Sequence, residues 1–176
     1  MSMRKCLFLI AVAAMAVPAE GPSYHDPGLK AVVQVAIVCR DIEATSRRWA
    51  AVLSVDPPQI HLTKPGREVK AMYRGHPTDG QAKLAFIKAG QVTLELIQPV
   101  GQDTSWRQFL DEKGEGVQHI AFQVANLDRT VKGFAETGTP VLHRGRYDDD
   151  SGSYVYVDTA KALGVTLELL HSDGKR

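Results

Sequence analysis

Two glutamates stand inside short runs that are otherwise apolar. The run 92–96 reads V-T-L-E-L and recurs letter for letter at 165–169, which places Glu95 and Glu168 at the same position in each copy. Alternate side chains of a strand point to opposite faces, so both glutamates point the same way relative to their own strands. A buried carboxylate is costly unless it is paired, hydrogen-bonded or bound to a metal ion. The repetition therefore indicates a duplicated module with a carboxylate of functional use in each half.

A second pair of polar side chains occupies matched positions nearer the start of each copy. The V-A-I-V run after Gln34 matches the I-A-F-Q run after His119, 85 residues further along the chain. Each of the two is followed on the same strand face by an alanine, whose small side chain leaves room above the sheet. If the modules pair about a pseudo-twofold axis, this pair and the two glutamates converge on one point.

These four side chains form a ligand set suited to one divalent metal ion. Two carboxylates offset the charge of the ion, and mixed nitrogen and oxygen ligands can leave positions open for water or substrate. Taken alone, each residue would more often be structural, but the matched positions in two repeats favour a metal site. The predicted metal ligands are Gln34, Glu95, His119 and Glu168. The set has no cysteine, which argues against a structural zinc knot, and leaves Co, Ni, Mn, Zn and Fe open.

The residues between these positions are expected to form the elements that hold them. Asp41 and Asn126 are predicted helix N-caps, because short polar side chains accept the free N–H groups of a first turn. Apolar residues then recur at helical spacing, and Gly138 suits the end of the second helix. The predicted apolar stripes are Ile42, Trp49, Val52 and Leu53 in the first helix, and Leu127, Val131, Phe134 and Ala135 in the second. Each module thus reads as a strand, a capped helix and further strands.

The first 19 residues are expected to be a signal peptide and not part of the fold. Arg4 and Lys5 precede an apolar run over 6–17, and small residues follow it. That run is short for a transmembrane span, although a signal anchor is the alternative interpretation. We therefore expect export to the periplasm or the medium, a flexible arm over 20–30, and no stable membrane span after processing.

Composition and charge exclude several classes of function. The chain has 176 residues, which suits one ordinary domain with a sizeable core. Its formal net charge is +1 without a basic stripe, so nucleic acid is not an expected partner. After processing, Cys39 is the only cysteine, so no intramolecular disulfide is possible. The chain lacks a phosphate-binding glycine loop and a nucleophile elbow, and no organic cofactor site is expected.

The remaining polar clusters have simpler interpretations. The run Asp148–Asp150 lacks the alternating ligands of a calcium loop and is typical of a polar hairpin turn. Arg144 and Arg146 either hold an anionic group near a cavity or lie on a solvated strand edge. Three histidines lie off the matched positions and are expected to be structural or exposed: His61, His76 and His143.

With these motifs the chain resembles the vicinal oxygen chelate superfamily. That superfamily includes glyoxalase I, methylmalonyl-CoA epimerase, extradiol dioxygenases and fosfomycin- and bleomycin-resistance proteins. The likeness runs from about residue 31 to residue 171 and is closest to the epimerase branch. Residues 114–122 read G-E-G-V-Q-H-I-A-F and are similar to the G-E-G-x-H-H-I-A-F phrase of that branch. Residues 82–87 and 93–99 look like its two central strands.

The resemblance implies an α+β fold in which two tandem βαβββ modules form a cup-shaped mixed β-sheet with helices on the outside. The domain would cover 31–171, with module one at about 31–100 and module two at about 117–171. A helix over 104–113 would link them, with Trp106, Phe109 and Leu110 on one side. The resemblance also implies that the chain pairs into a homodimer.

The activity that the resemblance implies is that of a divalent-metal-dependent isomerase or lyase. Such an enzyme moves a proton next to a carbonyl through a metal-bound enolate, on a small substrate with adjacent oxygens. Glu168 or Glu95 would act as the base. The other candidate is Asp79, which precedes Gly80 where the epimerase branch has an E-x-G phrase, although residues 77–80 also suit an ordinary turn.

Two departures from the epimerase pattern keep other functions open. The epimerases have a histidine where this chain has Gln34, and a Gln/Glu/His/Glu set is similar to one form of glyoxalase I. A glyoxalase I-like lactoylglutathione lyase is therefore one alternative. An epimerase that acts on acyl-CoA belongs inside a cell, whereas export is expected here, so a non-catalytic exported binding protein of the same fold is another. An extradiol dioxygenase is less favoured, because its iron site needs a second histidine.

Overall fold

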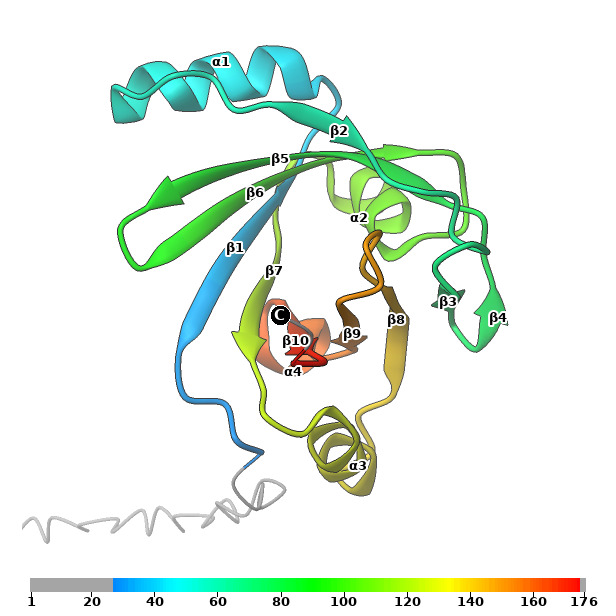
Figure 1. Ribbon diagram of the computed structural model, residues 1–176. Coiled ribbons are helices and arrows are strands. Elements are labelled where there is room, and N and C mark those ends of the chain that lie inside the picture. The colour runs from blue at the N-terminus through cyan, green and yellow to red at the C-terminus, as the bar shows by residue number, and fades with distance from the viewer. Residues whose placement is uncertain (1–26, 175–176) are drawn as a thin grey trace, which may run out of the picture.

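A single curved sheet of ten strands forms the body of the protein (Figure 1). The computed structural model describes residues 27–174. The expected signal peptide and residues 20–26 of the expected arm lie outside the described residues. The strand order is β2-β5-β6-β1-β7-β10-β9-β8-β3-β4. This curled, mixed sheet with helices packed on it confirms the predicted α+β fold.

Module one supplies the four strands at one end of the sheet and the two short strands at the other end. Its elements are β1 (Val32–Val38), α1 (Ile42–Leu53), β2 (Ile60–Leu62), β3 (Met72–Tyr73), β4 (His76–Pro77), β5 (Gln81–Ala89) and β6 (Val92–Val100). The helix α1 packs against β5 and β6 on the outer side of the curve (Figure 1). The linking helix α2 (Ser105–Lys113) follows, and the Thr104 hydroxyl accepts the Arg107 N–H at its start.

Module two repeats the arrangement with the next four strands of the same sheet. Its elements are β7 (Gly116–Gln123), α3 (Leu127–Glu136), β8 (Val141–Arg146), β9 (Gly152–Val157), α4 (Ala160–Leu163) and β10 (Thr166–Ser172). The helix α3 contacts β9 and β10. In the described N-terminal segment, the Pro27 carbonyl accepts a hydrogen bond from Thr130 in α3, and Leu29 packs against the core cluster that contains Phe134.

The strand register has the twofold symmetry that the sequence repeat predicts. β1 runs parallel to β6 and β7 runs parallel to β10, while β1 and β7 pair antiparallel at the centre. The symmetric cross-strand pairs are Ala36 with Glu95, Ala121 with Glu168, Gln34 with Ala121, and Ala36 with His119. Exchanging the modules maps each of these pairs onto another of them. The four predicted ligands therefore lie on two central strands and the two strands beside them.

The predicted helix caps are confirmed, but the predicted apolar stripes were too wide. The side chains of Asp41 and Asn126 accept N–H groups of the first turns of α1 and α3. Gly138 follows α3 with a φ of +77°, which suits a helix end. Val52 is 76% exposed, and Ala135 is exposed too. The buried faces instead include small polar residues, Ser46 in α1 and Thr130 in α3.

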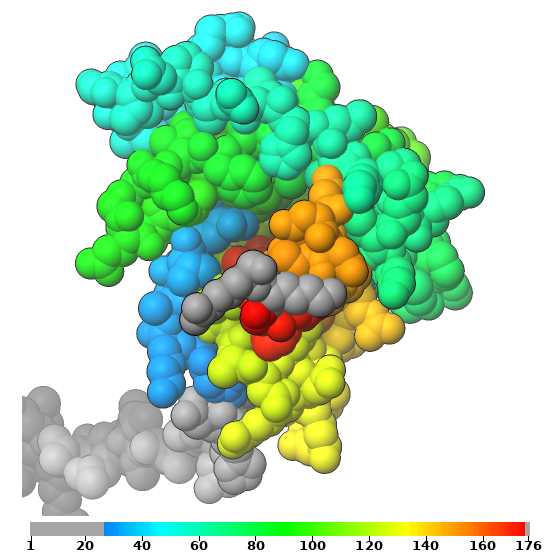
Figure 2. All heavy atoms as spheres, in the orientation of Figure 1, coloured from blue at the N-terminus to red at the C-terminus, as the bar shows by residue number. Residues whose placement is uncertain are grey.

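One hairpin links the modules in a way that the sequence repeat did not predict. β3 and β4 leave module one between β2 and β5, and β3 pairs with β8 of module two. After β8 ends, residues 147–151 form the turn into β9, as predicted for the Asp148–Asp150 run. In Figure 2 this turn lies against the segment that follows β2, and Lys64 N and Nζ donate to Asp148 across that contact.

None of the helices within 27–174 has the length and apolar character needed to cross a membrane.

Candidate metal centre

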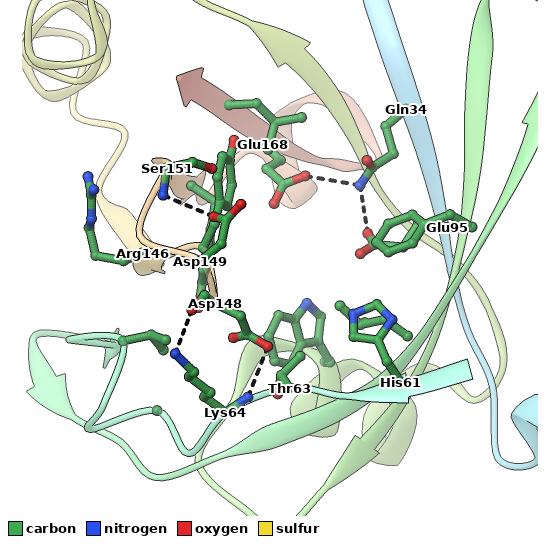
Figure 3. A pocket seen from close by; sticks show the side chains of 18 of the residues that line it. Gln34, His61, Thr63, Lys64, Glu95, Arg146, Asp148, Asp149, Ser151 and Glu168 are labelled. Carbon is green, nitrogen blue, oxygen red and sulfur yellow. Dashed lines mark hydrogen bonds between the residues drawn. The ribbon is translucent and has the colours of Figure 1, made fainter. Parts of the chain in front are cut away.

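The structure brings the four predicted ligand residues together, and Figure 3 shows three of them, Gln34, Glu95 and Glu168, at the wall of a cavity. His119 Nε2 lies 3.1 Å from Glu168 Oε2 and 3.4 Å from Glu95 Oε2. Gln34 Nε2 donates to Glu95 Oε2 over 2.6 Å and lies 3.4 Å from Glu168 Oε2. Candidate ligand atoms of the two glutamates and the histidine all lie within 4.8 Å of one another. This buried group could hold a metal ion.

Burial makes this group of charges unusual. His119 is fully buried, and Glu168 and Glu95 are only 3% and 6% exposed. Two carboxylates so close together, away from water, repel each other and lose hydration unless a cation lies between them. A protonated histidine supplies at most one positive charge. A divalent ion at the same point would balance both carboxylates.

The orientation of His119 fits a metal ligand. Its Nδ1 lies 2.6 Å from Gln118 Oε1, an acceptor, so Nδ1 carries the hydrogen and donates it. Nε2 is the ring nitrogen left to face the two carboxylates, and among residues 27–174 it has no hydrogen-bond partner of acceptable geometry. A ring held through Nδ1 with an unpartnered Nε2 aimed at two carboxylates is the arrangement that metal-binding histidines adopt. The residues present therefore fit a divalent ion.

The close carboxylates and the burial shift the pKa values of His119 and Glu95. Burial alone lowers the pKa of His119, but the nearby carboxylates of Glu168 and Glu95 outweigh burial and raise it to about 9. Burial also raises the pKa of Glu95, although the nearby His119 ring and the hydrogen bond from Gln34 act in the opposite direction. The carboxylates therefore favour the protonated form of His119.

A cavity of about 540 Å³ opens beside these residues and has aromatic walls. Across the sheet, Phe86 stands opposite Glu95 and Tyr156 stands opposite Glu168, so each glutamate has an aromatic cross-strand neighbour. Trp106 of the linking helix also lines the cavity, and its Nε1 donates to the Tyr156 hydroxyl over 3.2 Å. Sequence reasoning missed these rings. The available signal was the matched position of Phe86 and Tyr156 on the strands that precede the glutamate strands.

Three predicted side chains stand apart from this group. Asp79 is exposed, forms an ion pair with Arg67, and is absent from the described residues that line the cavity. Arg146 lines the cavity but pairs with Asp150 and Asp173, and Arg144 is exposed. The structure therefore does not bring Asp79 to the other candidate catalytic residues.

The remaining histidines have different surroundings. His143 is buried, its Nδ1 lies 3.1 Å from Ser105 Oγ, and burial lowers its pKa to about 3, with His119 adding repulsion. It is structural, as expected. His61 is exposed and stacks on Phe86 at the cavity wall, whereas His76 is exposed on β4.

Comparison with known proteins agrees with this architecture. The family model for the glyoxalase/bleomycin resistance protein/dioxygenase superfamily matches residues 33–157. The uncharacterized protein YqjC of Bacillus subtilis (strain 168) is 30% identical over 95 residues, which cover 53% of this chain and 68% of that protein.

Solved structures of methylmalonyl-CoA epimerases share the fold. A variant of the Streptomyces coelicolor enzyme in complex with 2-nitronate-propionyl-CoA aligns with a TM-score of 0.59 and 23% identity, over 83% of this chain and 96% of that one. The enzyme from Mycobacterium tuberculosis aligns with a TM-score of 0.56 and 16% identity, over 88% and 93% of the two chains. With the family match, the paired modules and the shared fold, the chain belongs to the glyoxalase/bleomycin resistance protein/dioxygenase superfamily, also called the vicinal oxygen chelate superfamily.

Proposed function

We propose that the protein is a divalent-metal-dependent isomerase or lyase that transfers a proton at a carbon next to a carbonyl, in the manner of the epimerase branch. One observation carries the proposal. His119 presents an unpartnered Nε2 to two buried carboxylates, 3.1 and 3.4 Å away, at the wall of a cavity large enough for a substrate. Two buried carboxylates beside one imidazole are not balanced in charge unless a cation joins them.

The residues that would hold the ion are Gln34, Glu95, His119 and Glu168. A divalent cation there would supply Lewis-acid stabilisation of negative charge that develops on a substrate oxygen as the neighbouring carbon loses its proton. Gln118 orients the imidazole through its Oε1, and Gln34 holds the Glu95 carboxylate through its amide. Aromatic walls beside the reacting carbon would reduce its contact with water and so strengthen electrostatic interactions there.

The proton acceptor is assigned to the glutamate pair. Glu95 and Glu168 both line the cavity at the candidate metal centre, so an oxygen of one of them can take the proton from a substrate carbon and return it. Asp79 is a weaker candidate, because Arg67 neutralises it on the surface. A base must come within hydrogen-bond distance of the proton that it removes.

Solvent exchange tests this function. The manganese-loaded protein is incubated in deuterated water with methylmalonyl thioesters and with 2-hydroxy and 2-oxo acids, and deuterium uptake is followed by NMR. We expect uptake at the carbon next to the carbonyl, a loss of at least about 100-fold in Glu95→Gln or Glu168→Gln, and near-normal rates in Asp79→Asn. No uptake into any compound by fully metal-loaded protein would contradict the proposal, and selective loss in Asp79→Asn would move the base to that residue.

A second candidate is a glyoxalase I-like lyase. The observation that favours it is Gln34, whose amide lies within 2.6 Å of Glu95 at the position where the epimerases have a histidine. Such an enzyme uses the same proton transfer on a hemithioacetal. Assays with methylglyoxal and several thiols separate the two candidates: consumption of the hemithioacetal supports the lyase, and its persistence under full metal loading excludes it.

A further inference from the structure

We propose that the cavity binds a small, phosphate-free acid that carries a flat aromatic group, and that it does not use the nucleotide part of an acyl-CoA. This inference rests on the proposed function for the placement of the two adjacent substrate oxygens at the candidate metal centre. It names the chemistry of the rest of the substrate from the walls and the rim of the cavity.

The first observation is the position of the aromatic rings. Phe86 and Tyr156 are the direct cross-strand neighbours of Glu95 and Glu168, so rings flank the candidate metal centre in both modules. Neighbouring residues across an antiparallel pair lie about 5 Å apart. A substrate whose oxygens reach the glutamates must therefore place the group on its next carbon against these rings. Flat apolar groups gain the most from such contacts.

The second observation is that contacts within the protein hold this wall in place. Tyr156 is buried, its hydroxyl accepts the Trp106 N–H, and its ring lies 6.1 Å from the Trp106 ring in an edge-on arrangement. The Tyr154 ring lies 5.6 Å from that of Tyr156, also edge-on. Pre-formed apolar walls with a few polar groups at one end are typical of small-molecule sites.

The third observation is the charge at the rim of the cavity. Among the described residues, the lysine and arginine side chains that line the cavity are those of Lys64 and Arg146. Lys64 Nζ donates to the Asp148 carbonyl over 2.7 Å, and Arg146 donates from Nε to Asp150 over 2.7 Å and from Nη2 to Asp173 over 2.6 Å. Both cations are thus engaged within the protein.

The carboxylates of Asp148 and Asp149 line the same rim, as Figure 3 shows. Phosphate groups are recognised by cations that are free to donate hydrogen bonds, and carboxylates repel them. The phosphates of a CoA ester would therefore meet, at this rim, two carboxylates and two cations that already donate hydrogen bonds within the protein. The volume, about 540 Å³, is also more than an acid of two or three carbons needs.

Isothermal titration calorimetry on the manganese-loaded protein tests this assignment with a matched pair of ligands. Phenyllactate and lactate share the same adjacent oxygens and differ by one phenyl ring. We expect phenyllactate to bind about 10- to 100-fold more tightly, the gain that burying a phenyl ring gives. Equal affinities would overturn the assignment.

A variant with a matched control locates the effect. Phe86 is 42% exposed, so Phe86→Ala leaves the core intact, and it should lower the ratio of phenyllactate affinity to lactate affinity by about threefold or more. Leu62, 54% exposed on the neighbouring strand and absent from the described cavity lining, provides the control Leu62→Ala, which should keep the wild-type preference. An unchanged preference in Phe86→Ala would overturn the role of the aromatic wall.

A second pair of ligands tests whether the nucleotide part of an acyl-CoA contributes to binding. Methylmalonyl-CoA should bind no more tightly than the methylmalonyl thioester of N-acetylcysteamine, which lacks the phosphates. A gain of tenfold or more from the CoA portion would overturn this part. Metal content is measured on the same samples, so failure to load the metal contradicts the proposed function, whereas full loading without a phenyl preference contradicts the substrate class alone.

Discussion

His119 and its three polar neighbours determine what this molecule can do at the scale of single residues. Each side chain alone would be unremarkable, but together they place two carboxylates and an unpartnered imidazole nitrogen in one buried group. The residues Gln34, Glu95, His119 and Glu168 were predicted from a repeated phrase and are brought together as expected. Gln118, which holds the His119 ring, was not predicted, because its role depends on a side-chain rotamer that sequence spacing does not specify.

Gln118 should support metal affinity without touching the metal. Gln118→Leu removes the acceptor for His119 Nδ1–H, so the ring loses its fixed tautomer and orientation, and metal affinity should fall about 10- to 100-fold. Titration with manganese, followed by calorimetry, measures the effect. Gln123→Leu is the matched control, because Gln123 is exposed on the same strand. Equal affinities in both variants and the wild type would contradict the role of Gln118.

The metal-free protein should lose stability as the pH rises. The folded pKa of His119 is about 9, above the ordinary value of 6.5, so its contribution is complete below pH 6.5 and is lost as the pH rises through 9. The raised pKa of Glu95 acts in the same direction, because the folded state favours its protonated form. Urea unfolding of chelator-treated protein between pH 6 and 10 should show a loss of a few kcal/mol, roughly. Constant or rising stability over that range would contradict these protonation states.

At the scale of elements, the strand register brings the matched residues of the two modules to one place in the sheet. The central pairing of β1 with β7, and of each with its glutamate strand, has the same register in both modules. The strands and capped helices were predictable, because alternation and capping residues are local signals. The β3–β4 hairpin was not, since two-residue strands have no measurable period and its partner β8 lies in the other module.

Close packing in the β8–β9 hairpin supplies a stability prediction. A Cβ added to Gly152 would overlap the backbone carbonyl of His171 and the ring of Tyr147, so Gly152→Ala should destabilise the fold by about 1–3 kcal/mol. The matched control is Gly133→Ala, in the middle of α3 with no atom near the added group, which should stabilise the fold by up to about 1 kcal/mol. Urea unfolding of both variants measures the difference. Similar stabilities would show that β9 and β10 separate readily at this point.

At the scale of the whole molecule, two modules share one site that neither could build alone. Module one contributes Gln34 and Glu95, module two contributes His119 and Glu168, and the linking helix adds Trp106 to the wall between them. Family membership and the fold were recognisable from the repeated phrases. The aromatic walls were not, because cavity shape arises from strand curvature and long-range packing. Export remains a prediction from residues 1–19, which N-terminal sequencing of the mature protein would check.

Metal analysis of the purified protein tests the central claim most directly. After incubation with divalent manganese, cobalt, nickel, zinc or iron and removal of the unbound ions, the wild-type protein should retain about one ion per chain. His119→Ala should lose most of that ion while keeping the circular dichroism spectrum of the wild type. Wild-type protein that retains no metal, or a folded His119→Ala variant that retains all of it, would contradict the existence of a metal centre at this point.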